Sequence, residues 1–148
     1  MSPAPVAPFP SPTTWVFDVD ACLVDSLTGS SLRPGARTLL AVLRARAGRM
    51  VLWSAGGADY ARARAEQHAV AGFFDAFVAK EGRDEHGRYL TSAFLDDLAG
   101  VVFVDDRTED LPRGAEVISV TPYLAPNEHD RGLSRVAEQV GCAREILP

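Results

Sequence analysis

Residues 13–26 read TTWVFDVDACLVDS, and this stretch decides the fold that is expected for the whole chain. Its apolar run at 15–17 predicts a strand, and two carboxylates, Asp18 and Asp20, follow at alternate positions. Side chains at positions i and i+2 of a strand point to the same face. Two like charges placed this close are costly unless a cation or another positive group offsets them. The stretch therefore predicts a metal or phosphate site at the carboxyl end of a strand.

Outward from this stretch, strand-like and helix-like patterns alternate along the chain. Further strands are expected at 49–53, 77–79, 101–104 and 117–120, helices at 34–47, 58–70, 91–98 and 127–140, and a loop or hairpin at 81–88. The last helix is expected to be capped by Asn127. Strands separated by helices predict an α/β domain over residues 13–148, with a three-layer, doubly wound (Rossmann-like) parallel sheet of about five strands.

Composition and charge narrow the class of protein. The 148 residues are 47% hydrophobic and carry a formal net charge of −5, which fits one globular domain without a broad nucleic-acid-binding surface. Cys22 and Cys142 are too few for a disulfide scaffold, which suits a reducing, cytoplasmic setting. No apolar run approaches the ~20 residues of a membrane span. The proline-rich segment 1–12 lacks the features of a signal peptide and is expected to be a flexible tail.

Polar residues follow four of the predicted strands at the point where each strand ends. They are, in chain order, Asp18 with Asp20, Ser54, Lys80, and Asp105 with Asp106. Because parallel strands in such a sheet end at one edge, these groups are expected to converge there. Carboxylates, a hydroxyl beside glycine amides, and an ammonium together suit the binding of a divalent, oxygen-preferring cation and a phosphate.

Three segments, in this order, resemble motifs of the haloacid dehalogenase (HAD) superfamily in its phosphatase branch. FDVDACLVD (17–25) is similar to the first motif of that family, VLWSAGG (51–57) to the second and VVFVDDRTED (101–110) to the fourth. The resemblance extends over about residues 15–120. It implies a HAD-like fold and a Mg²⁺-dependent phosphohydrolase that acts through an aspartyl phosphate.

The resemblance also implies roles for individual residues. Asp18 would be the nucleophile, and Asp20 would act as general acid and then as general base. Magnesium would be held by the Asp18 carboxylate, the Asp20 carbonyl and an acid of the fourth motif, which is either Asp105 or Asp106. Cys22 stands where the family usually has Thr or Val, and we interpret it as a packing residue.

The transferring phosphoryl group would be bound by Ser54 and by the amides of Ala55 and Gly56. The basic residue of the family's third motif has two candidates. Lys80 is the only lysine in the chain and ends the third predicted strand, whereas Arg107 directly follows the acid pair.

The spacing of the motifs bears on substrate access. One helix-length segment separates Asp18 from Ser54, and the interval from Ser54 to Asp105 holds no extra domain, so no cap domain is expected. An open site suits a phosphorylated substrate that is large or exposed, such as a phosphoprotein, a nucleic-acid end or an accessible small ester. Alternatively, a second copy of the chain would complete the site. The alternatives are a non-catalytic domain that binds metal, phosphate or a partner, and phosphoryl transfer to an acceptor other than water.

Overall fold

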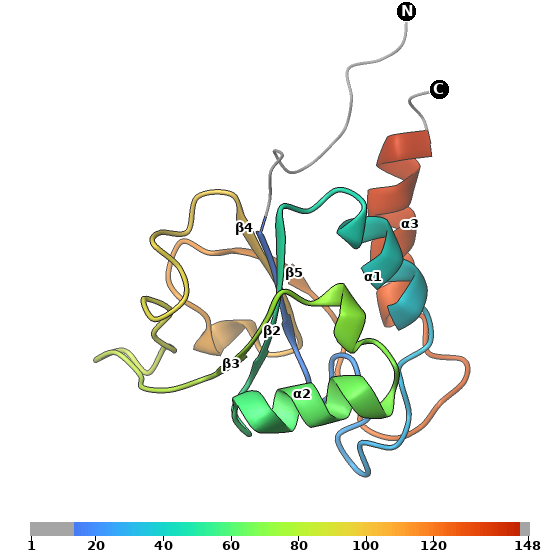
Figure 1. Ribbon diagram of the computed structural model, residues 1–148, viewed down its shortest axis with the longest axis horizontal. Coiled ribbons are helices and arrows are strands. Elements are labelled where there is room, and N and C mark those ends of the chain that lie inside the picture. Colours follow the sequence, from blue (N-terminus) through green and yellow to red (C-terminus); the bar gives the residue numbers. More distant parts are fainter. Residues whose placement is uncertain (1–13, 146–148) are drawn as a thin grey trace, which may run out of the picture.

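The computed structural model describes residues 14–145, with side chains described through residue 140, so the expected tail at 1–12 lies outside the described residues. Five parallel strands form one sheet in the order β3-β2-β1-β4-β5 (Figure 1). They are β1 (Thr14–Asp18), β2 (Arg49–Ser54), β3 (Ala76–Ala79), β4 (Val101–Asp105) and β5 (Glu116–Ser119). The chain adds β2 and β3 on one side of β1 and then crosses over to add β4 and β5 on the other side, so the order reverses at the boundary between β1 and β4. The doubly wound parallel sheet predicted from the sequence is confirmed.

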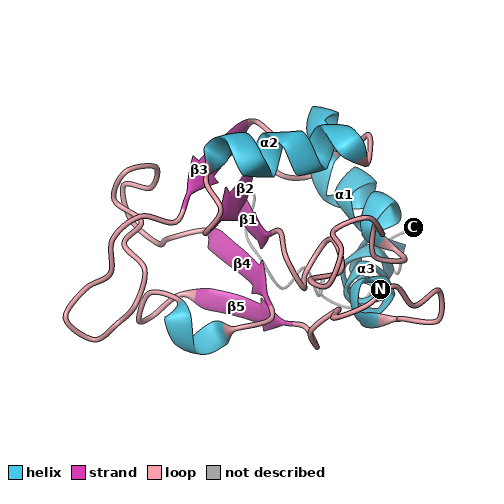
Figure 2. Cartoon of the chain, turned by 90° about the horizontal axis from the view of Figure 1, so that it is seen from below, coloured by secondary structure: helices cyan, strands magenta, loops and turns pink. Residues whose placement is uncertain are grey.

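Three α-helices cover one face of this sheet (Figures 1 and 2). They are α1 (Ala36–Arg44), α2 (Ala58–Gln67) and α3 (Gly132–Glu145). Alternate strand residues such as Phe17, Leu52 and Val104 share one buried core with Leu39 of α1 and Leu133 of α3. The period of two along each strand thus places one set of apolar side chains against the helices.

Among the described residues, no α-helix covers the opposite face. Segment 80–100 crosses it between β3 and β4, and a short 3-10 helix, η2 (Thr108–Asp110), follows β4 (Figure 2). Trp53 is fully buried on this side, and three aromatic rings have their centroids 5.6 Å from its ring: Tyr89, Phe94 and Phe103. The sheet therefore lies between a helical layer and a layer built of turns and aromatic side chains.

The prediction of a short helix at 91–98 is wrong, because these residues form turns. The Thr91 carbonyl accepts the amides of Phe94 and Leu95, and the chain does not continue as a helix. A helix this short has few internal hydrogen bonds and is marginal by itself. Packing of Phe94 and Leu95 in the core around Trp53 decides the backbone instead.

The last helix begins at Gly132 and not at Asn127. Asn127 Oδ1 accepts the His129 amide within a turn, whereas Asp130 Oδ1 accepts the Gly132 amide at 3.0 Å. The same Asp130 carboxylate binds the buried guanidinium of Arg33 at 2.6 Å. The start of α3 is therefore marked by a local contact from Asp130, and a tertiary ion pair with Arg33 holds that carboxylate in place.

The other elements lie within about three residues of their predicted bounds. A second 3-10 helix, η1 (Ala71–Phe73), links α2 to β3, and the segment at 81–88 is a hairpin closed by an antiparallel bridge between Arg83 and Tyr89. Within residues 14–145 no further domain is inserted between the strands. In this part of the chain, no helix combines the length and the apolar character that crossing a membrane requires.

Candidate active site

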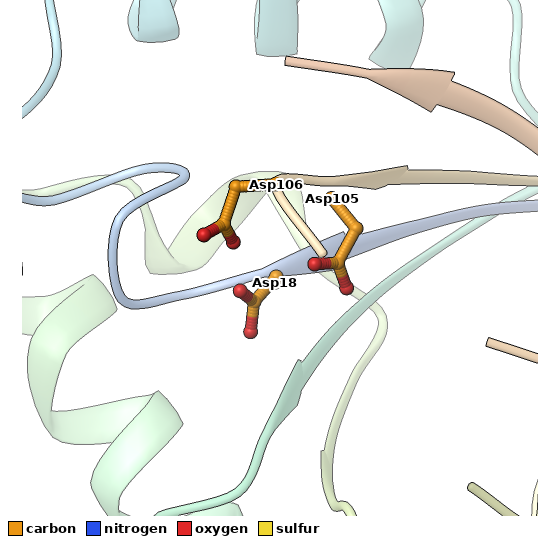
Figure 3. A group of neighbouring side chains, drawn as sticks. All are labelled: Asp18, Asp105 and Asp106. Atoms are coloured by element: carbon orange, nitrogen blue, oxygen red, sulfur yellow. The ribbon is translucent and has the colours of Figure 1, made fainter. Parts of the chain in front are cut away.

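The strands β1 and β4 are hydrogen-bonded neighbours at the point where the topology reverses. Asp18 closes β1, Asp105 closes β4, and Asp106 directly follows. Oxygen atoms of the three carboxylates all lie within 4.8 Å of one another (Figure 3). In open α/β sheets, this crevice beyond the strand ends is where ligands bind. The acids that end separate strands in the sequence therefore form one acidic cluster.

Lys80 follows β3 and reaches across the same edge of the sheet. Its Nζ lies 3.0 Å from Asp18 Oδ1 and 3.5 Å from Asp105 Oδ2. The ammonium also lies 4.9 Å from the Trp53 ring centroid and 5.2 Å from that of Tyr89, so two aromatic faces help to hold it. When all are ionised, the three carboxylates of the acidic cluster and this ammonium sum to a formal charge of −2.

Burial shifts the protonation of these groups. Burial raises the pKa of Asp18 well above its usual value, and the nearby charge of Asp105 raises it further, although Lys80 opposes both effects. Burial also raises the pKa of Asp105, against the opposing effects of Lys80 and the Arg107 amide. Burial by itself would lower the pKa of Lys80, but the charges of Asp18 and Asp105 outweigh it and raise that pKa. The acidic cluster thus has more negative charge than its lysine balances.

The acidic cluster fits a hard divalent cation. Its donors are carboxylate oxygens, which Mg²⁺ prefers, and its excess charge equals that of one such ion. Asp105 is already engaged, because Oδ1 accepts the Arg107 amide at 2.9 Å and Oδ2 faces Lys80. Asp106 is only half-buried, so it is the more accessible of the two acids that the sequence offered.

A cleft of about 390 Å³ opens over the acidic cluster and Lys80. Eight further residues contribute to its lining: Asp20, Ala21, Ala55, Arg83, Tyr89, Arg107, Asp110 and Leu124. Arg83 and Tyr89 were not predicted as site residues. Both belong to the hairpin that follows β3, and their only sequence signal is that this hairpin begins directly after Lys80.

The turn after β2 brings one of its predicted phosphate-binding residues, Ala55, into the cleft lining. Ser54 is buried, and its Oγ accepts the Gly56 amide at 3.0 Å. The Ser54 carbonyl also accepts the Lys80 amide at 2.8 Å. Ser54 therefore holds together the turn after β2 and the residue that follows β3.

Asp20 lies on the loop after β1 and lines the same cleft. Its Oδ1 accepts a hydrogen bond of 2.6 Å from the hydroxyl of Tyr60, which lies in the first turn of α2. Tyr60 was not predicted as a site residue. Its position along the chain could have indicated Tyr60. Helix α2 begins just after Ser54, so the first turn of α2 must lie near the edge where the strands end.

Two buried charged residues shape the loop that carries Asp20. Asp25, fully buried, accepts the amide and the hydroxyl of Thr28 at 2.7 Å each and the amide of Ser31 at 2.9 Å. Arg33 donates to the two backbone carbonyls that follow Asp20, at 3.5 and 3.3 Å. Asp25 thus orders the middle of the loop, and Arg33 holds its beginning.

The sequence left two questions undecided: whether Lys80 or Arg107 is the basic residue of the site, and whether Cys22 is a packing residue. Arg107 has a side chain that is 66% exposed and pairs with Asp110 at 3.4 Å, whereas Lys80 contacts Asp18 directly. Cys22 is fully buried with its Sγ 3.5 Å from a carbonyl of β4, and burial raises the pKa of its thiol. That environment suits packing, because a reactive cysteine needs a lowered pKa and access to solvent.

No family model and no curated protein matches this sequence. Among solved structures, the chain is similar to the NMR structure of the core domain of a protein provisionally named a phosphoglycolate phosphatase, from Streptococcus pneumoniae TIGR4. The two are 18% identical, the match covers 88% of this chain and 98% of that one, and the TM-score is 0.56. The likeness shows the fold alone, an α/β fold with a parallel sheet that this chain shares with that core domain, and no cap domain is inserted among residues 14–145.

Proposed function

We propose that the chain is a magnesium-dependent phosphohydrolase that cleaves phosphate monoesters through an aspartyl phosphate. The observation that carries this proposal is the acidic cluster with Lys80 set among its carboxylates, at the floor of a cleft where the topology reverses. The likeness of the fold to that of a phosphatase core domain supports it.

Asp18 is the proposed nucleophile. A carboxylate oxygen of Asp18 attacks phosphorus, the new O–P bond forms, and the bond from phosphorus to the leaving oxygen breaks. Lys80 holds Oδ1 of Asp18 at 3.0 Å and offsets part of the negative charge around it. Because the pKa of Lys80 is raised, its ammonium stays charged at neutral pH.

Asp20 is the proposed proton donor and acceptor. Its carboxyl group gives a proton to the leaving oxygen, and the resulting carboxylate then takes a proton from the water that hydrolyses the aspartyl phosphate. The position of Asp20 in the lining of the cleft, two residues beyond the proposed nucleophile, supports this role.

Asp18, Asp106 and the backbone carbonyl of Asp20 are the proposed ligands of Mg²⁺, with Asp105 beside them. When bound, the ion would screen the repulsion between the carboxylate of Asp18 and the phosphoryl oxygens. The fit of charge and donor type described above supports this assignment.

The phosphoryl oxygens are proposed to bind at the turn after β2 and at Lys80. The Ala55 amide belongs to a residue that lines the cleft. Ser54 Oγ accepts the Gly56 amide, which leaves the hydroxyl hydrogen of Ser54 to donate to a phosphoryl oxygen. In this arrangement the Gly56 amide serves by orienting Ser54.

The substrate is proposed to be a monoester whose leaving group extends out of the cleft. Three residues at the wall of the cleft are available to contact that group: Arg83, Arg107 and Leu124. Leu124 is 62% exposed, so an ester that is large or carried on a macromolecule would meet no barrier there.

The test is hydrolysis of an aryl phosphate with and without Mg²⁺ by the wild type, Asp18→Asn and Asp20→Asn. We expect turnover that requires Mg²⁺ and is lost by at least about 100-fold in both variants, with unchanged circular dichroism. Full activity of Asp18→Asn would remove the proposed nucleophile. Binding of Mg²⁺ without turnover of any phosphate ester would instead support a non-catalytic domain.

A further inference from the structure

We infer that Tyr60 is a positioning residue that orients Asp20 for proton transfer, an inference that rests on the proposed function. The hydroxyl of Tyr60 donates to Asp20 Oδ1 at 2.6 Å, and both residues are partly buried. One carboxyl oxygen of Asp20 is thereby held, and the other remains to exchange a proton with the leaving group. Tyr60 contacts Asp20 and not the reacting atoms.

The ring of Tyr60 occupies a space that Gly56 provides. A Cβ at position 56 would lie 2.7 Å from a carbon of the Tyr60 ring, which is closer than real Cβ contacts come. Gly56 does not have a positive φ, so the backbone does not require glycine there. Room for the Tyr60 ring is therefore the physical reason for a glycine at this position of the turn.

Arg64, one helical turn further along α2, holds the other side of Tyr60. Its Nε donates to the Tyr60 oxygen at 3.3 Å, and its guanidinium lies 5.2 Å from the ring centroid. Because the oxygen accepts from Arg64, its own hydrogen is directed to Asp20. A side chain at Gly29 would overlap the Arg64 guanidinium, so the loop after β1 also leaves room for this pair.

The consequence for the reaction depends on the leaving group. Asp20 gives its proton to the leaving oxygen as the bond to phosphorus breaks and the bond from Asp18 forms. A basic leaving group needs that proton, whereas a weakly basic one departs as an anion without it. Loss of the Tyr60 hydroxyl lets the Asp20 carboxyl rotate. The loss should therefore slow the hydrolysis of esters with basic leaving groups more than that of esters with weakly basic ones.

The experiment compares kcat/KM for phenyl phosphate and 2,4-dinitrophenyl phosphate, because this ratio reports the step in which the leaving group departs. We expect Tyr60→Phe to lose about 10- to 100-fold with phenyl phosphate and less than about 2-fold with the dinitrophenyl ester. Asp20→Asn should show the same selectivity, with a larger loss. The matched control is Tyr123→Phe, which removes a buried hydroxyl bonded to Ser31 and to the Asn127 amide. Its selectivity should equal that of the wild type.

Equal losses with both esters, or none with either, would overturn the role of Tyr60 while leaving Asp18 and Asp20 in place. If the wild type hydrolyses neither ester, activity on small aryl phosphates is excluded, and crystal structures of wild type and Tyr60→Phe then show separately whether Tyr60 positions Asp20. Rotation or multiple rotamers of Asp20 in Tyr60→Phe would support it. Asp20 in the single wild-type rotamer would overturn it.

Discussion

Lys80 connects the charge of the candidate site to the stability of the fold. Its side chain is 8% exposed, and it is the ammonium that pairs with both Asp18 and Asp105. Buried carboxylates without a partner are costly, because burial removes water that would otherwise solvate them. The residue that prepares the proposed nucleophile therefore also keeps two buried acids tolerable in the folded state.

Replacing Lys80 by Met should destabilise the protein by about 3 kcal/mol in the absence of divalent ions, because Asp18 and Asp105 lose their counter-charge. Urea unfolding with and without MgCl₂ measures this, and Mg²⁺ should restore part of the loss. The control Arg131→Met breaks an exposed pair with Glu138 and should change the free energy of unfolding by less than about 1 kcal/mol. Equal stability of Lys80→Met and wild type would contradict this account.

At the scale of elements, the loop between β1 and α1 is ordered by charges that contact its backbone. Asp25 accepts hydrogen bonds within the loop, and Arg33 links the loop to the start of α3 through Asp130. A side chain at Gly132 would overlap the Arg33 guanidinium and force that group to shift from its place beside Asp130. The position of Asp20 over the cleft thus depends on contacts far along the chain.

Asp25 should make stability depend on pH. Burial would raise the pKa of Asp25, but hydrogen bonds from Thr28 and Ser31 outweigh it and lower that pKa below its usual 3.8. A lowered pKa in the folded state means that ionised Asp25 stabilises the fold above about pH 4 and stops doing so as the pH falls through the folded value. Asp25→Asn should therefore cost about 1–3 kcal/mol at neutral pH.

Urea unfolding of wild type and Asp25→Asn at neutral pH and at about pH 3 checks this sign, since the difference between the two proteins should shrink in acid. A difference that stays constant, or grows, as the pH falls would show that Asp25 does not titrate as described.

The ion pair of Arg33 and Asp130 should couple the loop to α3. Arg33→Met leaves the carboxylate of Asp130, which is 13% exposed, without its partner and should cost about 3 kcal/mol. Asp130→Asn should cost much less in the Arg33→Met background than in the wild type, with a coupling energy above about 1 kcal/mol. A double-mutant cycle of urea unfolding measures this, and additive losses would mean that the pair does not link the two elements.

For the whole molecule, the arrangement of layers separates stability from the candidate chemistry. One continuous core joins the sheet to the three helices, and an aromatic cluster around Trp53 seals the other face. The strand ends lie at the edge between these layers, where Asp18 and Asp105 meet. Binding at that edge should stabilise the folded chain without changing its core, since the acidic cluster exists only when β1 and β4 are paired.

Mg²⁺ should therefore raise the Tm of the wild type, and the rise should grow with the concentration of Mg²⁺. At a hundredfold excess of Mg²⁺ over Kd, the free energy of unfolding should increase by about 2.7 kcal/mol. Asp106→Asn should abolish most of this shift, because Asp106 is the accessible acid of the cluster. The control Asp59→Asn removes an exposed acid of α2 and should keep the full shift. A wild-type Tm that is insensitive to millimolar Mg²⁺ would argue against the metal site.

Much of the fold was predictable because strands and helices have short periods that can be read locally. The apolar runs ending in Asp18, Ser54 and Asp105 indicated strands, and their parallel pairing followed from the helices expected between them. Segment 91–98 was not predictable in the same way. Its conformation is set by packing on Trp53, whose partners lie on distant parts of the chain.

The sequence by itself determined which carboxylates end the strands and that these strand ends share one edge, because side-chain alternation and parallel topology follow from local pattern. Only the tertiary structure decided that Lys80 rather than Arg107 contacts Asp18, that Tyr60 contacts Asp20 and that Arg33 pairs with Asp130 at the start of α3. The physical reason is that these contacts join residues separated by 40 or more positions. Such contacts are chosen by how the layers pack and not by any pattern along the chain.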